Sequence, residues 1–148
     1  ECGIRESYRI DGEVFISAED YCTGRVWADS YCYSFYPIDM HASDGGGIDT
    51  RPLQEGTLPT IPLRAMIPKG SEHLLVAGRC VSGDRTANSA FRVQASCMAT
   101  GQVAGAVAAL AAQAGTNLQS VPESAIVGLL RQHHAIVPDS ITNSHGCP

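Results

Sequence analysis

The sequence predicts an α+β fold with a partial α/β arrangement, in which a β-rich first half precedes a single buried strand and a long helix. Segments before residue 60 alternate polar and apolar side chains, as half-buried strands do. A continuous apolar run ends at Gly78, and an alanine-rich stretch with helical spacing follows Arg92. The 148 residues suffice for one hydrophobic core and are short for two.

The N-terminal third is predicted to hold a hairpin, a short helix and a strand. Residues 5–16 (RESYRIDGEVFI) alternate around Asp11–Gly12, a pair typical of tight turns. Ser17 is a predicted N-cap with Asp20 in the capping-box position, and Gly24 is a predicted helix end. Residues 26–41 carry most of the aromatic side chains at spacings that favour a strand ending near Pro37.

The middle of the chain is predicted to contain a loop and two strands. Residues 42–59 hold four glycines and two prolines, which predicts a long surface loop or flap. An edge strand is predicted at 63–67, because Pro62 and Pro68 cannot donate to a ladder. Residues 73–78 (HLLVAG) form a short apolar run bounded by a turn and a glycine, which predicts a fully buried strand.

Two helices are predicted after Arg92. The first continues to Gly115, a typical C-terminal cap, and places Gly101, Gly105 and Ala109 on one face that permits a close approach. The second begins near Pro122 and places its apolar side chains, Ile126, Leu129 and Leu130, on one face.

Composition excludes several classes of function. A net charge of −5 with 10 Lys and Arg provides no basic surface for nucleic acid. We expect a soluble protein without membrane association, because no stretch approaches the roughly 20 apolar residues that a membrane span requires. None of the six cysteines forms a CxxC pair, so we expect mainly buried free thiols, a pattern that slightly favours the cytoplasm without deciding the compartment.

The stretch LLVAGRCVSGDR, residues 74–85, has two interpretations. A strand that ends in a loop before a helix creates a pocket where backbone N–H groups face an anion or a carbonyl oxygen. Gly78 would then allow the backbone to approach a ligand, with Arg79 presented at the strand end. A glycine after a strand is equally common in an ordinary turn that binds nothing.

The longer run IPKGSEHLLVAGRCVSGDRTANSAFRVQASCMATGQVAGAVAALA resembles the C-terminal segment of FAD-dependent oxidoreductases of the glutathione-reductase-like superfamily. Those sequences read close to P-x-x-x-x-N-L-L-V-A-G-R-C-x-S and then R-V-x-x-x-C-M-A-x-G-x-A-A-G. RESYRIDG, YPIDMH and IPLRAMIPKG also look like that branch, so the resemblance covers roughly residues 4–113.

The resemblance implies a Rossmann-like FAD domain whose last strand and helix lie in this chain, with hydride transfer between an organic substrate and flavin. It assigns Gly78, Arg79 and Cys80 to a strand end near the flavin ribityl and pyrophosphate groups. It assigns Cys97, Met98 and Ala99, with Gly101 in the next turn, to a helix whose N-terminus faces N1 and the C2 carbonyl of the flavin ring. A helix N-terminus stabilises the anionic reduced flavin.

Three features of the sequence depart from the family pattern. His73 stands where Asn is usual, and SGDRTA replaces the commoner SATHEA loop. No GxGxxG fingerprint occurs, and the chain does not begin with Met, so we expect a C-terminal piece that needs a missing N-terminal GxGxxG half to bind FAD. The open edges that this leaves also predict a possible homodimer.

We accordingly expect three regions. Residues 1–70 would form a β-rich region over a small-molecule substrate, with a glycine-rich flap at 42–59. Residues 71–115 would complete the FAD-binding domain, and residues 116–148 would form a terminal helix and tail.

Candidate catalytic residues flank the predicted site. Arg92 stands where related flavoproteins clamp a substrate carboxylate, but a structural bridge to Asp39 or Glu6 is the slightly favoured alternative. Asp39 and His41, close to Tyr36, share one face of the predicted strand and suit either proton transfer or a structural hydrogen bond.

Other chemistry is not favoured. Cys80 and Cys97 lack the spacing of a catalytic dithiol. No metal site is predicted either. The side chains of His133 and His134 diverge on a helix, and His145 and Cys147 lie in the tail. Two other functions remain open: a non-enzymatic fragment or binding module without flavin, and a small-molecule binder that uses the glycine-rich flap at 44–47.

Overall fold

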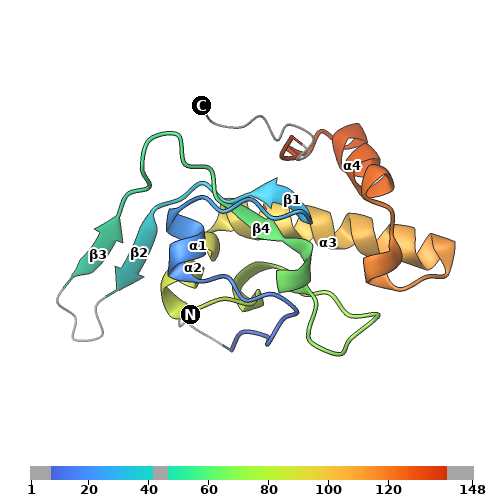
Figure 1. Ribbon diagram of the computed structural model, residues 1–148, viewed down its shortest axis with the longest axis horizontal. Coiled ribbons are helices and arrows are strands. Elements are labelled where there is room, and N and C mark those ends of the chain that lie inside the picture. Colours follow the sequence, from blue (N-terminus) through green and yellow to red (C-terminus); the bar gives the residue numbers. More distant parts are fainter. Residues whose placement is uncertain (1–7, 42–46, 140–148) are drawn as a thin grey trace.

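A computed structural model describes residues 8–41 and 47–139 and shows a mixed arrangement of helices and short strands (Figure 1), which confirms the α+β class. The helices are α1 (Ala18–Cys22), α2 (Arg85–Phe91), α3 (Gln94–Ala114) and α4 (Glu123–Gln132). The strands are β1 (Ser30–Tyr33), β2 (Ile38–His41), β3 (Ile48–Arg51) and β4 (Thr60–Pro62). Three 3₁₀ turns complete the fold: η1 (Leu63–Met66), η2 (Gly78–Cys80) and η3 (Leu118–Ser120).

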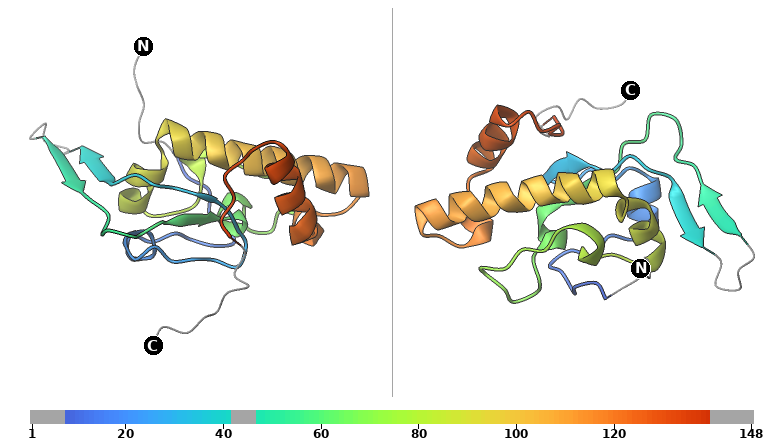
Figure 2. Two further views of the ribbon diagram at one scale, coloured as in Figure 1. Left: turned by 90° about the horizontal axis from the view of Figure 1, so that it is seen from above. Right: turned by 180° about the vertical axis from the view of Figure 1, so that it is seen from behind.

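The strands form two separate antiparallel pairs. β1 pairs with β4, with Cys32 opposite Ile61, and this pair lies against α3. β2 pairs with β3, with Asp39 opposite Thr50, and this hairpin extends from one end of the molecule (Figures 1 and 2). The predicted strand at 26–41 is therefore two strands. The predicted loop at 42–59 is wrong at 48–51, because hydrogen bonds to β2 order those residues.

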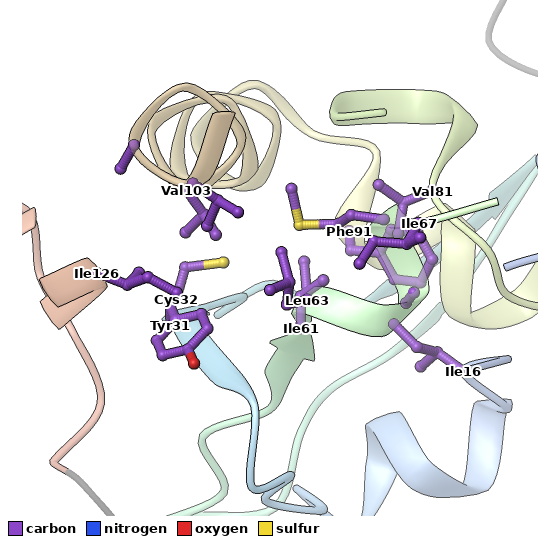
Figure 3. Packing of buried hydrophobic residues seen from close by; sticks show 14 of the residues in the cluster. Ile16, Tyr31, Cys32, Ile61, Leu63, Ile67, Val81, Phe91, Val103 and Ile126 are labelled. Atoms are coloured by element: carbon purple, nitrogen blue, oxygen red, sulfur yellow. The ribbon is translucent and has the colours of Figure 1, made fainter. Parts of the chain in front are cut away.

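The hydrophobic core lies between α3 and the β1–β4 pair. Figure 3 shows Val103 pointing from α3 toward Cys32 of β1, with Ile126 of α4 beside them. The core continues under α2, where Phe91 is fully buried and its ring centroid lies 6.4 Å from that of Tyr21. One contiguous cluster therefore joins elements from both halves of the sequence.

Local capping signals are confirmed. Ser17 caps α1, the Ser17 side chain accepts from the Asp20 N–H, and the Asp20 carboxylate accepts from the Ser17 N–H. The chain leaves α1 through Gly24, whose φ is +67°. Gly115 ends α3 in the left-handed conformation, with φ of 63°, as predicted. These predictions hold because each depends on neighbours within a few residues.

The predicted hairpin at 5–16 is wrong where the structure describes it. Gly12 bridges Pro68, and Ile16 bridges Gly83, so the segment lies among residues from the middle of the chain. The Ile10 N–H donates to Cys80, and the Glu13 N–H donates to Ile67. Asp11–Gly12 does not close a hairpin, because the backbone groups on its two sides bond to different distant segments.

Two further strand predictions are wrong. The strand near Pro62 covers residues 60–62, while residues 63–66 form the 3₁₀ turn η1. Residues 73–77 form no strand. The Val76 N–H donates to the Met66 carbonyl at 2.8 Å, but no described segment pairs alongside this run, and Leu74 is 54% exposed. A buried strand needs neighbours on both sides, and the described residues do not provide them.

The helices after residue 84 differ from prediction at their beginnings. The helix predicted to start at Arg92 begins at Gln94, and a separate helix, α2, precedes it with Asp84 as its N-cap. The last helix is confirmed, with Pro122 at the N-cap and Ile126 and Leu130 buried. By length and composition α3, with 21 residues, is apolar enough to span a membrane, so the expectation that no such stretch exists is wrong. Core helices pass the same test.

Cys22, Cys32, Cys80 and Cys97 are free thiols, as predicted, but of these four only Cys32 is buried, so the expectation of mainly buried thiols is wrong for the described cysteines. Cys2 and Cys147 lie outside the described residues. Burial raises the pKa of the Cys32 thiol from its ordinary value of 9.0 to about 12. The unfolded chain therefore loses this proton at lower pH than the folded chain. The stability that results is fully present below pH 9.0 and is lost as the pH rises toward about 12.

Replacing Cys32 with alanine should reduce the loss of stability in alkaline solution. We expect the free energy of unfolding of the wild-type chain to fall about 1 kcal/mol further per pH unit above 9.0 than that of Cys32→Ala. Urea denaturation on both sides of pH 9.0 measures this difference. Cys22→Ala is the matched control at an exposed thiol and should follow the wild type. A parallel decline in wild type and Cys32→Ala would contradict the assignment.

Candidate functional site

The turn η2 is held in place on several sides. The Gly78 N–H donates to Thr100 Oγ1 on α3 at 3.0 Å. The Arg79 carbonyl accepts from Asn88 Nδ2 on α2 at 3.1 Å, and the Cys80 carbonyl accepts from the Ile10 N–H at 2.9 Å. Three elements from different parts of the chain therefore fix the backbone of this turn.

Glycine is required at position 78 by backbone conformation and not by crowding. Its φ is +78°, a region that side chains with a Cβ rarely adopt. A Cβ placed at Gly78 would lie 3.6 Å from Cys97 Sγ, an ordinary van der Waals distance. The close neighbour of Gly78 is thus the first turn of α3.

The N-terminus of α3 has no side-chain cap among the described residues. Val93 is the N-cap residue, and the Cys97 N–H donates to its carbonyl at 2.9 Å. The N–H groups of Gln94, Ala95 and Ser96 make up the first turn, where the helix dipole concentrates partial positive charge. This end of a 21-residue helix is suited to an external acceptor.

Cys97 lies between the two features. Its Sγ donates to the Arg92 carbonyl at 3.2 Å. Burial raises the pKa of the Cys97 thiol, and the charge of Arg79 opposes that effect in part. Cys97 is therefore a neutral packing residue at physiological pH, and Arg79 and Cys80 are both close enough to affect it electrostatically.

The predicted cofactor residues divide among three places. Gly78, Arg79, Cys80 and Cys97 meet at the contact of η2 with α3. Met98 and Ala99 line an adjacent recess of about 460 Å³, which Phe35 and Ile136 also border. Gly101 lies in a separate cleft of about 500 Å³ between α3 and α4, together with Gly105 and Ala109.

The recess beside α3 is unusually apolar for a surface feature. Met98 is 72% exposed and Phe35 is 71% exposed, although both are large apolar side chains. His134 also lines the recess and has a φ of +59°, the one positive value for a residue other than glycine in the described chain. An exposed apolar surface of this kind is typical of a ligand or partner contact.

The predicted catalytic residues lie at the junction of β2, α2 and α3. Arg92 is buried, and its guanidinium donates to the Asp39 backbone carbonyl at 3.3 Å. The Asp39 N–H donates to Ser89 Oγ at 3.2 Å. Arg92 and Asp39 are therefore neighbours, joined by a hydrogen bond to the Asp39 backbone carbonyl, and the choice between a carboxylate clamp and a structural bridge stays a prediction.

The Asp39 carboxylate has one oxygen, Oδ1, that is buried without a hydrogen-bond partner among the described residues. Such an oxygen is costly unless something donates to it. His41 pairs with Ile48 through its backbone, while its side chain and the whole of Glu6 lie outside what the structure describes. The predicted pair of Asp39 and His41 therefore stays a prediction.

Sequence reasoning missed a buried chain of hydroxyl groups beneath the α3 N-terminus. The chain joins the hydroxyls of Tyr21, Ser34 and Ser96, and Thr100 is attached to it through the Ser96 backbone carbonyl. All four residues are at most 3% exposed. Burial raises the pKa of Tyr21, so its phenol stays protonated. Isolated serines and threonines carry no spacing signal in a sequence, because they are equally common on surfaces and in caps.

No group of three or more metal-ligating side chains converges within residues 8–41 and 47–139. His133 and His134 are adjacent at the end of α4. His145 and Cys147 lie beyond the described residues.

Comparison with known proteins gave one match. A family model described as FAD dependent oxidoreductase matches residues 1–132, which is most of the chain. Neither a curated protein nor a solved structure matches.

Two glycine substitutions should have effects of opposite sign on stability. Gly78→Ala should lower the free energy of unfolding by about 1 kcal/mol, because alanine is strained at a φ of +78°. Gly101→Ala should raise it by about 0.5–1 kcal/mol, because Gly101 lies within α3 and a Cβ there meets nothing within 4 Å. Chemical denaturation of both variants measures these changes. Equal effects would contradict the described conformation of η2.

Proposed function

Because the chain belongs to the FAD dependent oxidoreductase family, we propose that it supplies the C-terminal wall of a flavin site at the contact of η2 with α3. Oxidation and reduction with FAD are the activity and cofactor of that family. The observation that carries the placement is the uncapped N-terminus of α3 beside a turn fixed by three hydrogen bonds. We infer the finer glutathione-reductase-like assignment from the sequence motifs alone.

The residues at this contact fit one part of FAD. The first-turn N–H groups of α3 are donors for a carbonyl such as the C2 carbonyl of the flavin ring, and the helix dipole favours negative charge there. The recess next to them, with Met98 and Ala99, is apolar enough to contact a planar ring. Arg79 adds positive charge on the side where the ribityl chain and pyrophosphate would lie.

When bound, the flavin supplies the acceptor for a hydride from an organic substrate. The described residues would orient the ring, hold partial positive charge at its N1 side through the α3 N-terminus, and keep water out through the apolar recess. Cys97 would act by packing, since burial raises its pKa and keeps it neutral. Gly101 faces the cleft between α3 and α4, where a Cβ would meet nothing within 4 Å, so we assign it no direct contact with the ring.

The ADP part of FAD requires residues that this sequence does not offer, since it has no GxGxxG fingerprint. We propose that a GxGxxG-bearing half of the same protein provides them. Residues 73–77 support this, because an apolar run without a described neighbour suits the edge of a parallel sheet. Residues 71–115 would complete that sheet domain, residues 1–70 would cover the substrate, and residues 116–148 would form a terminal helix and tail.

The exposed strand β3 supports a second, weaker association. All four of its residues are exposed, and an open edge can pair with another copy of the chain. A homodimer through this edge is compatible with the proposed flavin site, because β3 lies at the far end of the projecting hairpin (Figure 1).

The substrate side of the site would lie near β2 and the α2–α3 junction. The buried Asp39 Oδ1, which lacks a partner in the described chain, is an acceptor for a substrate or protein donor. Arg92 would hold a substrate carboxylate, and His41 would exchange a proton with the substrate. A small carboxylic acid is therefore the substrate class that we propose.

The spectrum of the protein from its complete natural reading frame tests the flavin proposal. We expect purified protein to show the visible absorption of flavin and to lose it when the region before Glu1 is deleted. Supplying that region as a separate chain together with FAD should restore the colour. A folded complete protein that stays colourless with added FAD would instead favour a binding module without flavin.

The carboxylate proposal has its own test in the flavin-loaded protein. Titration with acetate should perturb the flavin spectrum more strongly than titration with acetamide. Arg92→Lys should weaken acetate binding roughly tenfold or more, because a planar fork of donors becomes a point charge. Arg64→Lys, at a surface ion pair with Asp29, should leave acetate binding unchanged. Equal binding of acetate by all three proteins would leave Arg92 as a structural bridge only.

A further inference from the structure

We propose that Ser96 and Thr100 are positioning residues of the flavin site. Ser96 would act through a buried chain of hydroxyl groups that ends at Tyr21, and Thr100 through its bonds to the Ser96 carbonyl and the Gly78 N–H. The proposal rests on the proposed function, because it concerns how the α3 N-terminus and η2 are held relative to each other. Neither hydroxyl group needs to touch the cofactor. Each would instead fix the donors that do.

The chain of contacts is continuous across four segments. Ser96 Oγ lies 2.8 Å from Ser34 Oγ, and Ser34 Oγ lies 3.1 Å from the Tyr21 hydroxyl oxygen. Thr100 Oγ1 lies 3.0 Å from the Ser96 carbonyl oxygen and accepts from the Gly78 N–H. Tyr21 belongs to α1, Ser34 follows β1, Ser96 and Thr100 belong to α3, and Gly78 begins η2.

The direction of each hydrogen bond follows from the carbonyl groups at the two ends. The Tyr21 hydroxyl lies 2.8 Å from the Ser34 carbonyl and 2.9 Å from the Tyr36 carbonyl, so its single proton is directed to these acceptors. Ser34 Oγ must then donate to Tyr21, and Ser96 Oγ must donate to Ser34. The Ser96 hydroxyl proton is therefore used in the bond to Ser34, inside the protein.

The Thr100 hydroxyl proton is also used within the protein. Its hydroxyl donates back to the Ser96 and Cys97 carbonyls, each at 3.0 Å, within its own helix. Only its lone pairs face η2, so Thr100 can act toward Gly78 as an acceptor alone. This arrangement fixes the orientation of the Gly78 N–H and thus of the turn that carries Arg79.

Burial makes this network sensitive to a single change. Tyr21 and Thr100 are each 1% exposed, so water cannot replace a lost partner. Valine at position 100 would keep the shape of threonine but leave the Gly78 N–H without its acceptor. Serine would keep the acceptor. The two substitutions therefore separate the role of the hydroxyl from the role of the packing.

The test uses the flavin-loaded protein from the complete reading frame. Thr100→Val should weaken FAD binding roughly tenfold, as expected for one buried hydrogen bond, and should shift the flavin reduction potential. Thr100→Ser should restore both to near the wild-type values. Ser96→Ala, which breaks the link to Ser34, provides a second variant and should move the potential in the same direction. It serves in place of Thr100→Val if that protein does not fold.

Thr60→Val is the matched control. Thr60 lies on β4 and is 3% exposed. Its hydroxyl bonds to the Ser30 hydroxyl and to the Arg25 carbonyl, and neither residue belongs to η2 or α3. It should lose stability without a change in FAD affinity or potential. In the chain without flavin, amide hydrogen exchange at Gly78 should speed up in Thr100→Val but not in Thr60→Val.

The outcomes separate this inference from the proposed function. If wild type binds FAD and Thr100→Val matches Thr60→Val in affinity and potential, the positioning role is overturned while the flavin site stands. If the wild-type protein binds no FAD, the proposed function fails and the inference fails with it. Unchanged exchange at Gly78 in Thr100→Val would also overturn it, because the acceptor would not be controlling the turn.

Discussion

The burial of one face of α3 is the constraint on which the other elements depend. Val103 and Val107 are almost fully buried and pack toward the β1–β4 pair, which short strands of this length could not stabilise alone. α4 packs across the far part of the helix, and η2 packs on its first turns. The positions of the candidate site residues outside β2 therefore depend on the packing of this one helix.

The opposite face of α3 explains why the site is open. Gly101, Gly105 and Ala109 line a cleft with α4, and the recess at Met98 continues toward Phe35. Small residues on a helix face allow another backbone to approach closely, and large exposed apolar residues are stabilised by contact. The apolar character that favours a bound ring thus extends beyond the proposed flavin contact, along a surface that a further part of the protein could cover.

Sequence alone predicted what depends on near neighbours and failed where distant segments meet. The capping box at Ser17 and the stop at Gly115 were predictable because the atoms involved are a few residues apart. Residues 8–16 and 73–77 alternate or are apolar as strands should be, but their hydrogen bonds depend on segments that the sequence does not identify. The helix α2 did have a local signal, because Asp84 is a good N-cap residue.

The site divides in the same way. Gly78 and Cys97 come together as the resemblance implied, whereas Met98 and Gly101 lie in other hollows of the surface. The hydroxyl groups of Ser34, Ser96 and Thr100 could not be found from their spacing, because their contacts join four segments. Polar residues of this kind are recognised only when burial and partners are known.

The Asp84 carboxylate has a consequence for how the molecule opens. One oxygen accepts from the Ala87 N–H at the start of α2, and the other accepts from the Ala18 N–H at the start of α1, 66 residues away. α1 has five residues and α2 has seven, lengths at which isolated helices are not stable. A single side chain therefore couples their unwinding, and the two helices form one cooperative unit that frays and refolds together.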